Sequence, residues 1–281
     1  MITLQNLHTH STWCDGKDGV EEMILGALSR GFDSVGFSVH SPMFYAPEHG
    51  VAEEDVEHYI ADVRAMAKKY ADRIKVFCGV ELDLYSKLDL EPYEYIIGSV
   101  HYLKIGDEYV GFDRNAATVK SVIDTYFGGD GMKYAKAYYE TLATLPTRGK
   151  IDVIGHFDLI TKHSEKEDFF DWESPVYQGY AMAAMDALIP HVKILEINTG
   201  AIARGYRTTP YPTAFILKEW KARGGEIIIS SDCHNKDFLT CGFAESIALA
   251  KACGYTHTQV LTENGFEPVP LEEMEKKLSP Q

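Results

Sequence analysis

Short runs rich in valine and isoleucine alternate with longer amphipathic stretches along most of the chain, and this alternation restricts the fold more than any other feature. Such runs are typical of parallel strands buried on both faces. Seven of them are present: residues 2–8, 35–40, 75–83, 95–101, 151–158, 192–198 and 226–234. The intervening stretches carry apolar residues at helical spacing, as Val20, Met23, Ile24 and Ala27 illustrate.

These stretches predict helices over residues 20–28, 56–70, 176–189, 213–223 and 243–253, with two more in 115–145. Only the connection from Asp83 to Tyr95 is too short for a crossover helix. Strands that alternate with helices in this way indicate an α/β protein with a (β/α) barrel-like fold. A doubly wound open sheet is the alternative, since periodicity does not reveal whether a sheet closes. No repeat or Pro/Ser-rich linker divides the chain, which predicts one domain over residues 1–281.

Metal-ligating residue types fall at the carboxyl ends of the predicted strands. Six of the 11 histidines do so: His8, His10, His40, His101, His156 and His234. Glu81 lies near the end of the third predicted strand, and Asp232 precedes His234 by two residues. Because the carboxyl ends of parallel strands meet on one face, these side chains are expected to converge there.

The local spacing of these residues supports a shared ion. Side chains at i and i+2 of a strand point to the same side, so His8 and His10 can face one ion together. Asp232 and His234 repeat this spacing, with Cys233 facing away as a packed thiol. Asp15 lies on a loop beside Gly16, where turn formation alone is the alternative to metal ligation. Five histidines are assigned to structural or solvent-facing positions: His49, His58, His163, His191 and His257.

Mixed imidazole and carboxylate ligands suit zinc, manganese or iron(II), with zinc favoured where imidazole dominates. The candidates outnumber the ligands of one tetrahedral ion and include few cysteines, which favours a multinuclear catalytic site over a closed structural zinc site. Motifs of covalent phosphatases and hydrolases are absent from the sequence: Cys-x5-Arg, Asp-x-Asp, G-x-S-x-G and the Walker-type G-x4-G-K-[ST]. Metal-activated water is the chemistry that remains.

Net charge and cysteine content restrict the binding partners and the cellular compartment that the sequence predicts. A formal net charge of −15 and a pI near 5.1 speak against binding nucleic acid through a basic face. Five scattered cysteines without a C-x-x-C motif are typical of reduced thiols. No signal peptide and no apolar run long enough to cross a bilayer is recognised. The sequence thus predicts a cytoplasmic protein with no membrane partner, and it does not define an oligomeric state.

Seven ordered segments resemble the PHP (polymerase and histidinol phosphatase) superfamily of metal-dependent phosphoesterases: HTHSTWCDG, GFSVHSP, GVELD, GSVH, DVIGHFDL, EINTGAIARG and SSDCH. The resemblance implies a distorted (β/α)7 barrel with its metal site at the carboxyl ends of the strands. In length and in its Tyr211–Pro212 segment the chain is most similar to the stand-alone histidinol-phosphatases. These hydrolases convert L-histidinol phosphate to L-histidinol and phosphate in histidine biosynthesis.

The resemblance also implies a trinuclear centre of divalent ions. The first ion would be held by four side chains: His8, His10, Glu81 and Asp232. The second would share Glu81 and add His101 and His156, and the third would use Asp15, His40 and His234. Some relatives carry histidine where this chain has Asp15. Arg204 resembles a phosphate-binding arginine of the family, and Lys162 stands where some relatives use arginine.

The resulting hypothesis is a metal-dependent phosphatase that acts on a small phosphate monoester. A hydroxide bridging the first two ions would attack phosphorus in line, with His8, His10, Glu81 and Asp232 as catalytic residues. The third ion and Arg204 would neutralise phosphate charge, and Asp232 or a metal-bound water would protonate the leaving alkoxide. Two alternatives remain open: a PHP-type phosphoesterase acting on nucleotides or nucleic-acid ends, and a non-catalytic metal-binding domain.

Overall fold

Seven parallel strands form the inner layer of the protein, whose computed structural model describes residues 2–278. They follow one another around the sheet in chain order: β1 (Gln5–Asn6), β2 (Ser34–Phe37), β3 (Lys75–Asp83), β4 (Tyr95–Ser99), β7 (Val153–Ile154), β8 (Ile194–Asn198) and β9 (Glu226–Ser230). A parallel bridge between Thr9 and Cys233 joins the first strand to the last, where the His10 amide donates to the Cys233 carbonyl at 3.0 Å. The (β/α)7 barrel is therefore confirmed, and the doubly wound sheet is excluded because its strand order would reverse.

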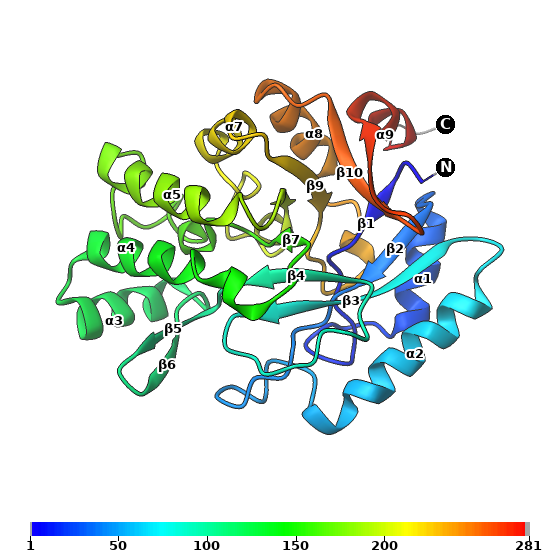
Figure 1. Cartoon of the computed structure of the whole chain (residues 1–281), viewed down its shortest axis with the longest axis horizontal. Helices are drawn as coiled ribbons and strands as arrows, with labels where there is room; N and C mark the ends of the chain where they lie inside the picture. The colour runs from blue at the N-terminus through cyan, green and yellow to red at the C-terminus, as the bar shows by residue number, and fades with distance from the viewer. Residues whose placement is uncertain (1, 279–281) are drawn as a thin grey trace.

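Helices surround this barrel (Figure 1). The principal ones are α1 (Val20–Ser29), α2 (Val56–Lys69), α3 (Ala116–Phe127), α4 (Gly131–Leu142), α5 (Pro175–Leu188), α7 (Ala214–Ala222) and α8 (Phe243–Ala252). Each lies in a stretch where helical spacing predicts it. Side-chain caps begin three of them: Asn115 accepts from the Thr118 amide, Asp130 from the Met132 and Lys133 amides, and Ser174 from the Tyr177 amide. None of the described helices has the length and hydropathy to cross a bilayer.

Shorter helical elements lie in the connections between the strands and the principal helices. These are the turns η1 (Glu53–Asp55), η2 (Leu145–Arg148), η3 (Leu159–Thr161) and η4 (Lys236–Phe238), and the one-turn helix α6 (Gly200–Ala203). The hairpin of β5 (Tyr102–Ile105) and β6 (Glu108–Gly111) follows β4 directly. This hairpin is not predicted from the sequence.

A second hairpin and a final helix cover the end of the barrel opposite the strand carboxyl ends. β10 (His257–Thr262) and β11 (Gly265–Pro270) pair antiparallel, and α9 (Leu271–Leu278) follows them. The side-chain amide of Gln5 makes two hydrogen bonds to the backbone of Leu261. Its Nε2 donates to the Leu261 carbonyl at 2.9 Å, and its Oε1 accepts from the Leu261 backbone amide at 2.7 Å. Figure 1 shows β10 and α9 beside β1, so the two ends of the described chain meet at this hairpin.

The floor of the barrel is apolar and sits beneath its polar end. Phe77, Ile97, Ile194 and Ile228 belong to one buried cluster that is separate from the main core between barrel and helices. They lie an even number of residues before polar side chains of the same strands, so they share the inward face with them. Tyr95 completes this layer, and its hydroxyl donates to the Leu7 carbonyl at 2.5 Å.

Gly79 allows the Tyr95 ring to lie flat against β3, because an added Cβ would sit 2.3 Å from a ring carbon. We expect Gly79→Ala to lower the free energy of unfolding by ~1–3 kcal/mol through this overlap. Urea denaturation measures the change. Gly179→Ala in α5 is the control, since its Cβ meets nothing within 4 Å and alanine favours a helix. Equal stability of Gly79→Ala and the parent protein would contradict the packing argument.

Candidate metal centre

The nine side chains expected as ligands lie together at the carboxyl ends of six barrel strands. We call them the ligand cluster: His8, His10, Asp15, His40, Glu81, His101, His156, Asp232 and His234. Three groups within it have potential ligand atoms all within 4.8 Å of one another: His8, His10 and Asp232; His40, Glu81 and His101; and His10, Asp15, His40 and His234. His156 is outside these groups, but its Nε2 lies 2.9 Å from Glu81 Oε1.

Glu81 is the centre of the cluster and is almost completely buried. Its Oε2 lies 2.8 Å from His40 Nδ1 and 3.2 Å from His8 Nε2. Its Oε1 lies 2.9 Å from His156 Nε2 and 3.4 Å from His101 Nε2. Burial opposes ionisation, yet the surrounding imidazoles hold the pKa of Glu81 well below its ordinary value. The same carboxylate, acting against the desolvation of the ring, raises the pKa of His101 to about 9.

Asp232 is the second buried carboxylate, and its backbone has φ of 46° in the left-handed region. Its Oδ1 lies 3.2 Å from His10 Nε2, and its Oδ2 accepts from the Arg204 guanidinium at 3.1 Å. A Cβ on Gly200 would lie 2.6 Å from Asp232 Oδ2, so glycine is needed there. A strained, tightly surrounded carboxylate of this kind is a feature of functional sites.

Asp15 contacts the cluster through its carboxylate, although it is half exposed. Its Oδ2 lies 3.1 Å from His234 Nε2, and its Oδ1 lies 3.8 Å from His10 Nδ1 and 3.9 Å from His40 Nε2. Despite desolvation, His234 and the other two rings hold the pKa of Asp15 below its ordinary value. A role in the turn alone would not require these contacts, so the geometry favours Asp15 as a ligand.

The donor atoms fit divalent metal ions. His8 Nε2, His10 Nε2 and Glu81 Oε2 are buried and lack a hydrogen-bond partner within residues 2–278. Buried polar atoms are normally paired, and a bound cation would satisfy all three. The grouping differs from the implied one in two ways, since His40 lies closest to Glu81 and His10 takes part in two groups. Cys233 is buried with a raised pKa, as expected of a packed thiol.

Sequence reasoning missed polar residues behind the ligands. Asp83 accepts a hydrogen bond from the His101 amide at 3.0 Å, and its Oδ2 lies 3.4 Å from His101 Nδ1. Glu196 and Asn198 of β8 are fully buried and reach the cluster from beneath. The signal was available in the sequence, because all three follow the i, i+2 spacing at the end of a predicted strand.

A cavity of about 970 Å³ opens beside the ligand cluster. Arg204 and Lys162 both line it. The Lys162 ammonium lies 2.9 Å from Asp113 Oδ2 and 4.9 Å from the centre of the Tyr206 ring. The volume suits a small molecule, and its wall combines cationic, acidic and aromatic groups. His49 also lines this cavity, with Nδ1 2.7 Å from the Tyr102 hydroxyl, which is compatible with a structural role.

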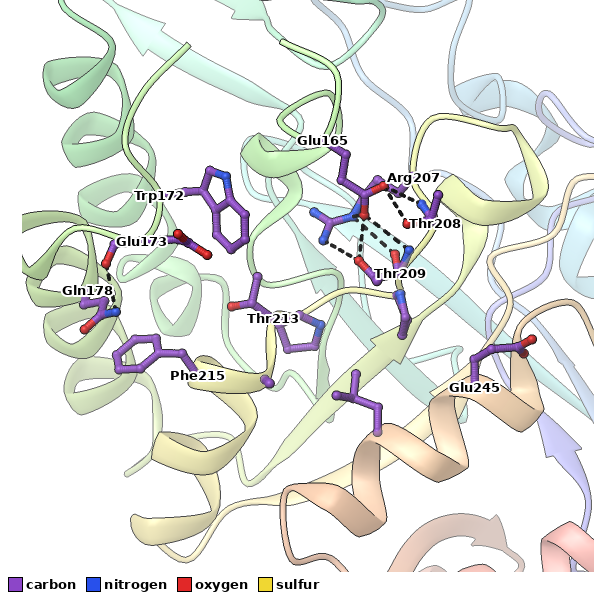
Figure 2. A pocket seen from close by; sticks show the side chains of 14 residues that line it. Glu165, Trp172, Glu173, Gln178, Arg207, Thr208, Thr209, Thr213, Phe215 and Glu245 are labelled. Atoms are coloured by element: carbon purple, nitrogen blue, oxygen red, sulfur yellow. Dashed lines mark hydrogen bonds and ion pairs between the residues drawn. The ribbon is translucent and has the colours of Figure 1, made fainter. Parts of the chain in front are cut away.

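A second cavity, of about 660 Å³, is lined in part by the loop that follows β8 (Figure 2). Arg207 donates to the Thr161 carbonyl at 3.1 Å, and Glu165 accepts from the Thr208 amide at 2.6 Å and the Thr209 hydroxyl at 2.7 Å. These bonds tie the loop after β7, which carries Lys162, to the loop after β8, which carries Arg204. The Arg207 and Glu165 side chains are therefore occupied in holding the two loops together.

A barrel of seven parallel strands with histidines and carboxylates at the strand carboxyl ends is typical of proteins with a metal site. The comparison with known families gives the same class of protein. The PHP domain model matches residues 6–200, and the chain belongs to this family. It is 28% identical to the probable histidinol-phosphatase of Deinococcus radiodurans, covering 88% of this chain and 92% of the relative. It is 23% identical to the histidinol-phosphatase of Bacillus subtilis, over 81% and 92% of the two chains.

Among solved structures, the chain has the fold of the histidinol phosphate phosphatase of Lactococcus lactis. That crystal structure is a complex with zinc, L-histidinol and phosphate. The TM-score is 0.71 at 17% sequence identity, and the similarity covers 95% of this chain and all of the other.

We expect Glu81→Ala to lose more metal than any change outside the cluster, because Glu81 contacts five of the six imidazoles. Loss of a direct ligand should exceed the ~10–100-fold loss of affinity typical of an outer partner. Elemental analysis of desalted protein measures the bound metal, and the variant should also lack turnover while remaining folded. His257→Ala is the control, since this exposed histidine of β10 lies outside the cluster. Parent-like metal content and turnover in Glu81→Ala would refute the assignment.

Proposed function

We propose that this protein is a metal-dependent phosphomonoesterase that hydrolyses L-histidinol phosphate to L-histidinol and phosphate. The observation that carries this proposal is the convergence of nine imidazole and carboxylate side chains beside a cavity that also contains Arg204 and Lys162. The relatives from Deinococcus radiodurans and Bacillus subtilis match nearly their whole length and are named for this activity. The Lactococcus lactis structure, which shares the fold, is described with both products of that reaction.

The ligand cluster would hold divalent ions, three in the arrangement that the family resemblance implies. Zinc is favoured because six of the nine ligands are imidazoles, with manganese and iron(II) as alternatives. Such ions act as Lewis acids that polarise phosphoryl oxygens and make water acidic enough to serve as a nucleophile near neutral pH. His8, His10, Glu81 and Asp232 would be the catalytic set, since their donor atoms surround the buried centre of the cluster.

Arg204 and Lys162 would bind the phosphate group of the substrate. Both face the large cavity, and a guanidinium can donate two parallel hydrogen bonds to phosphate oxygens. Asp232 orients Arg204 through its bond at 3.1 Å, while His234 Nδ1 lies 3.1 Å from the other terminal nitrogen. Lys162 would contribute a point charge, and its ion pair with Asp113 keeps it at the wall of the cavity.

We also propose that residues 1–281 act as one domain in the cytoplasm. One buried cluster extends from Leu4 to Met274, which supports a single cooperative unit. All five cysteines are free, as expected in a reducing compartment.

Purified, metal-reconstituted protein should hydrolyse L-histidinol phosphate with a higher kcat/KM than AMP, an aryl phosphate or a single-stranded oligonucleotide. Activity should disappear with a chelator and return when the metal is restored, because no covalent nucleophile replaces it. Phosphate release measures all four substrates in one buffer. Preference for AMP or the oligonucleotide would support the nucleotide alternative. Bound metal without hydrolysis of any phosphate would support a non-catalytic domain.

We expect Arg204→Ala to lower kcat/KM for L-histidinol phosphate by ~100–1,000-fold, the typical cost of removing a group that stabilises transition-state charge. Arg204→Lys should recover part of the loss because it restores the charge without the bidentate geometry. Steady-state kinetics measures both variants. Arg223→Ala is the matched control, since that arginine pairs with Asp186 and Glu219 on the outer helices. A parent-like rate for Arg204→Ala would remove it from the phosphate site.

A further inference from the structure

β8 is the one barrel strand that contributes no residue to the ligand cluster, yet its carboxyl end carries Glu196 and Asn198. Both side chains are completely buried. They are two residues apart on one strand and therefore point to the same, inward side. Water cannot solvate a carboxylate in this position, so protein donors must stabilise its charge. The identity of these donors shows what Glu196 does.

Four donors surround the Glu196 carboxylate. Oε1 lies 2.6 Å from His8 Nδ1 and accepts from the Ser230 hydroxyl at 2.5 Å. Oε2 accepts from the His156 amide at 2.9 Å and from the Asn198 side-chain amide at 2.9 Å. An ionised carboxylate has about four acceptor positions and no donor, so all of its capacity is used. The four donors come from β8 itself, from both of its neighbours in the sheet and from the segment after β1.

The contact with His8 determines the tautomer of that ring. Because an ionised carboxylate only accepts, the proton between the two groups belongs to His8 Nδ1. His8 Nε2 then faces the centre of the cluster, 3.2 Å from Glu81 Oε2 and 3.8 Å from Asp232 Oδ1. It is buried there without a hydrogen-bond partner among the described residues. The ring is thus held by its outer nitrogen and offers its inner nitrogen as a ligand.

We propose that Glu196 is a positioning residue of the metal centre: it fixes His8 as the Nδ1–H tautomer and directs Nε2 toward the ion. A carboxylate behind a ligating imidazole sets the ring orientation and increases its basicity. Glu196 does not touch the centre itself, so it acts through His8. It also holds the His156 amide and thereby places the segment that carries a further ligand. The proposal rests on the metal centre of the proposed function but not on the identity of the substrate.

Glu196→Gln tests the role of the carboxylate with little change of volume. Glutamine presents one donor group where Glu196 only accepts, and that group faces donors already in place. The affinity of the metal-free protein for Zn²⁺, measured by competition with a chromophoric chelator, should fall ~10–100-fold. Glu226→Gln is the matched control, because Glu226 lies at the exposed start of neighbouring β9. Parent-like affinity in Glu196→Gln would overturn the proposal.

A double-mutant cycle separates positioning from a general loss of structure. If Glu196 acts through His8, adding Glu196→Gln to His8→Ala should cause little further loss of Zn²⁺ affinity. Losses that multiply fully would overturn the proposal. Urea unfolding of the metal-free variants shows whether they are folded, and Glu196→Asp provides a second variant that keeps the charge and should bind better than Glu196→Gln.

The parent protein provides a readout that needs no variant. In Zn²⁺-loaded protein labelled with ¹⁵N-histidine, His8 should show a protonated Nδ1 and a metal-bound Nε2, with the signal assigned by its loss in His8→Ala. Protonation at Nε2 would overturn the proposal even if every Glu196 variant failed to fold. A protein that binds Zn²⁺ in this way but does not hydrolyse L-histidinol phosphate would refute the proposed function and leave the role of Glu196 intact. A parent protein that binds no Zn²⁺ would refute both.

Discussion

A carboxylate buried among imidazoles is the constraint on which the rest of the structure depends. Glu81 is out of reach of bulk water and contacts five histidines, which come from four strand ends. These contacts exist only if several strands end at the same level with the correct face inward. A slip of one residue in any of them would turn its ligand away from Glu81. The contacts of Glu81 therefore form only when the strands of the barrel have the correct register.

Two further features hold the strand ends and the loops of the site in position. Beneath the polar ends, the apolar floor fills the barrel with inward side chains such as Phe77 and Ile228. Beside them, the bonds of Arg207 and Glu165 join the loops that carry Lys162 and Arg204. The candidate site thus combines expected ligands on strand ends with cations on loops that hydrogen bonds join, and an arrangement of this kind can hold functional groups in place.

The barrel was predictable because its strands and helices have clear and different hydrophobic periods. The candidate ligands were predictable for a related reason: parallel strands bring their carboxyl ends together, so strand-end histidines far apart in sequence could be grouped. The two-residue strands β1 and β7 were predicted too long, since valine and isoleucine content does not show where regular pairing stops. The hairpins β5–β6 and β10–β11 were missed because partly exposed or Pro-interrupted strands carry a weak signal. The role of Glu196 was not predictable, because the i, i+2 spacing at a strand end does not show whether a carboxylate binds metal or orients a ligand.

The bridge between Thr9 and Cys233 closes the barrel, so the candidate site forms only when this bridge forms during folding. His8 and His10 lie on one side of this seam and Asp232 and His234 on the other, so the first and almost the last part of the chain must meet before the centre exists. The entropy of closing so long a loop must be overcome before these contacts stabilise anything, which makes closure a late event in folding. On a ribosome, the first histidines emerge long before their partners are synthesised. Ions that bind only the closed barrel would stabilise it relative to the open chain, by an amount that rises with the ratio of free ion to dissociation constant.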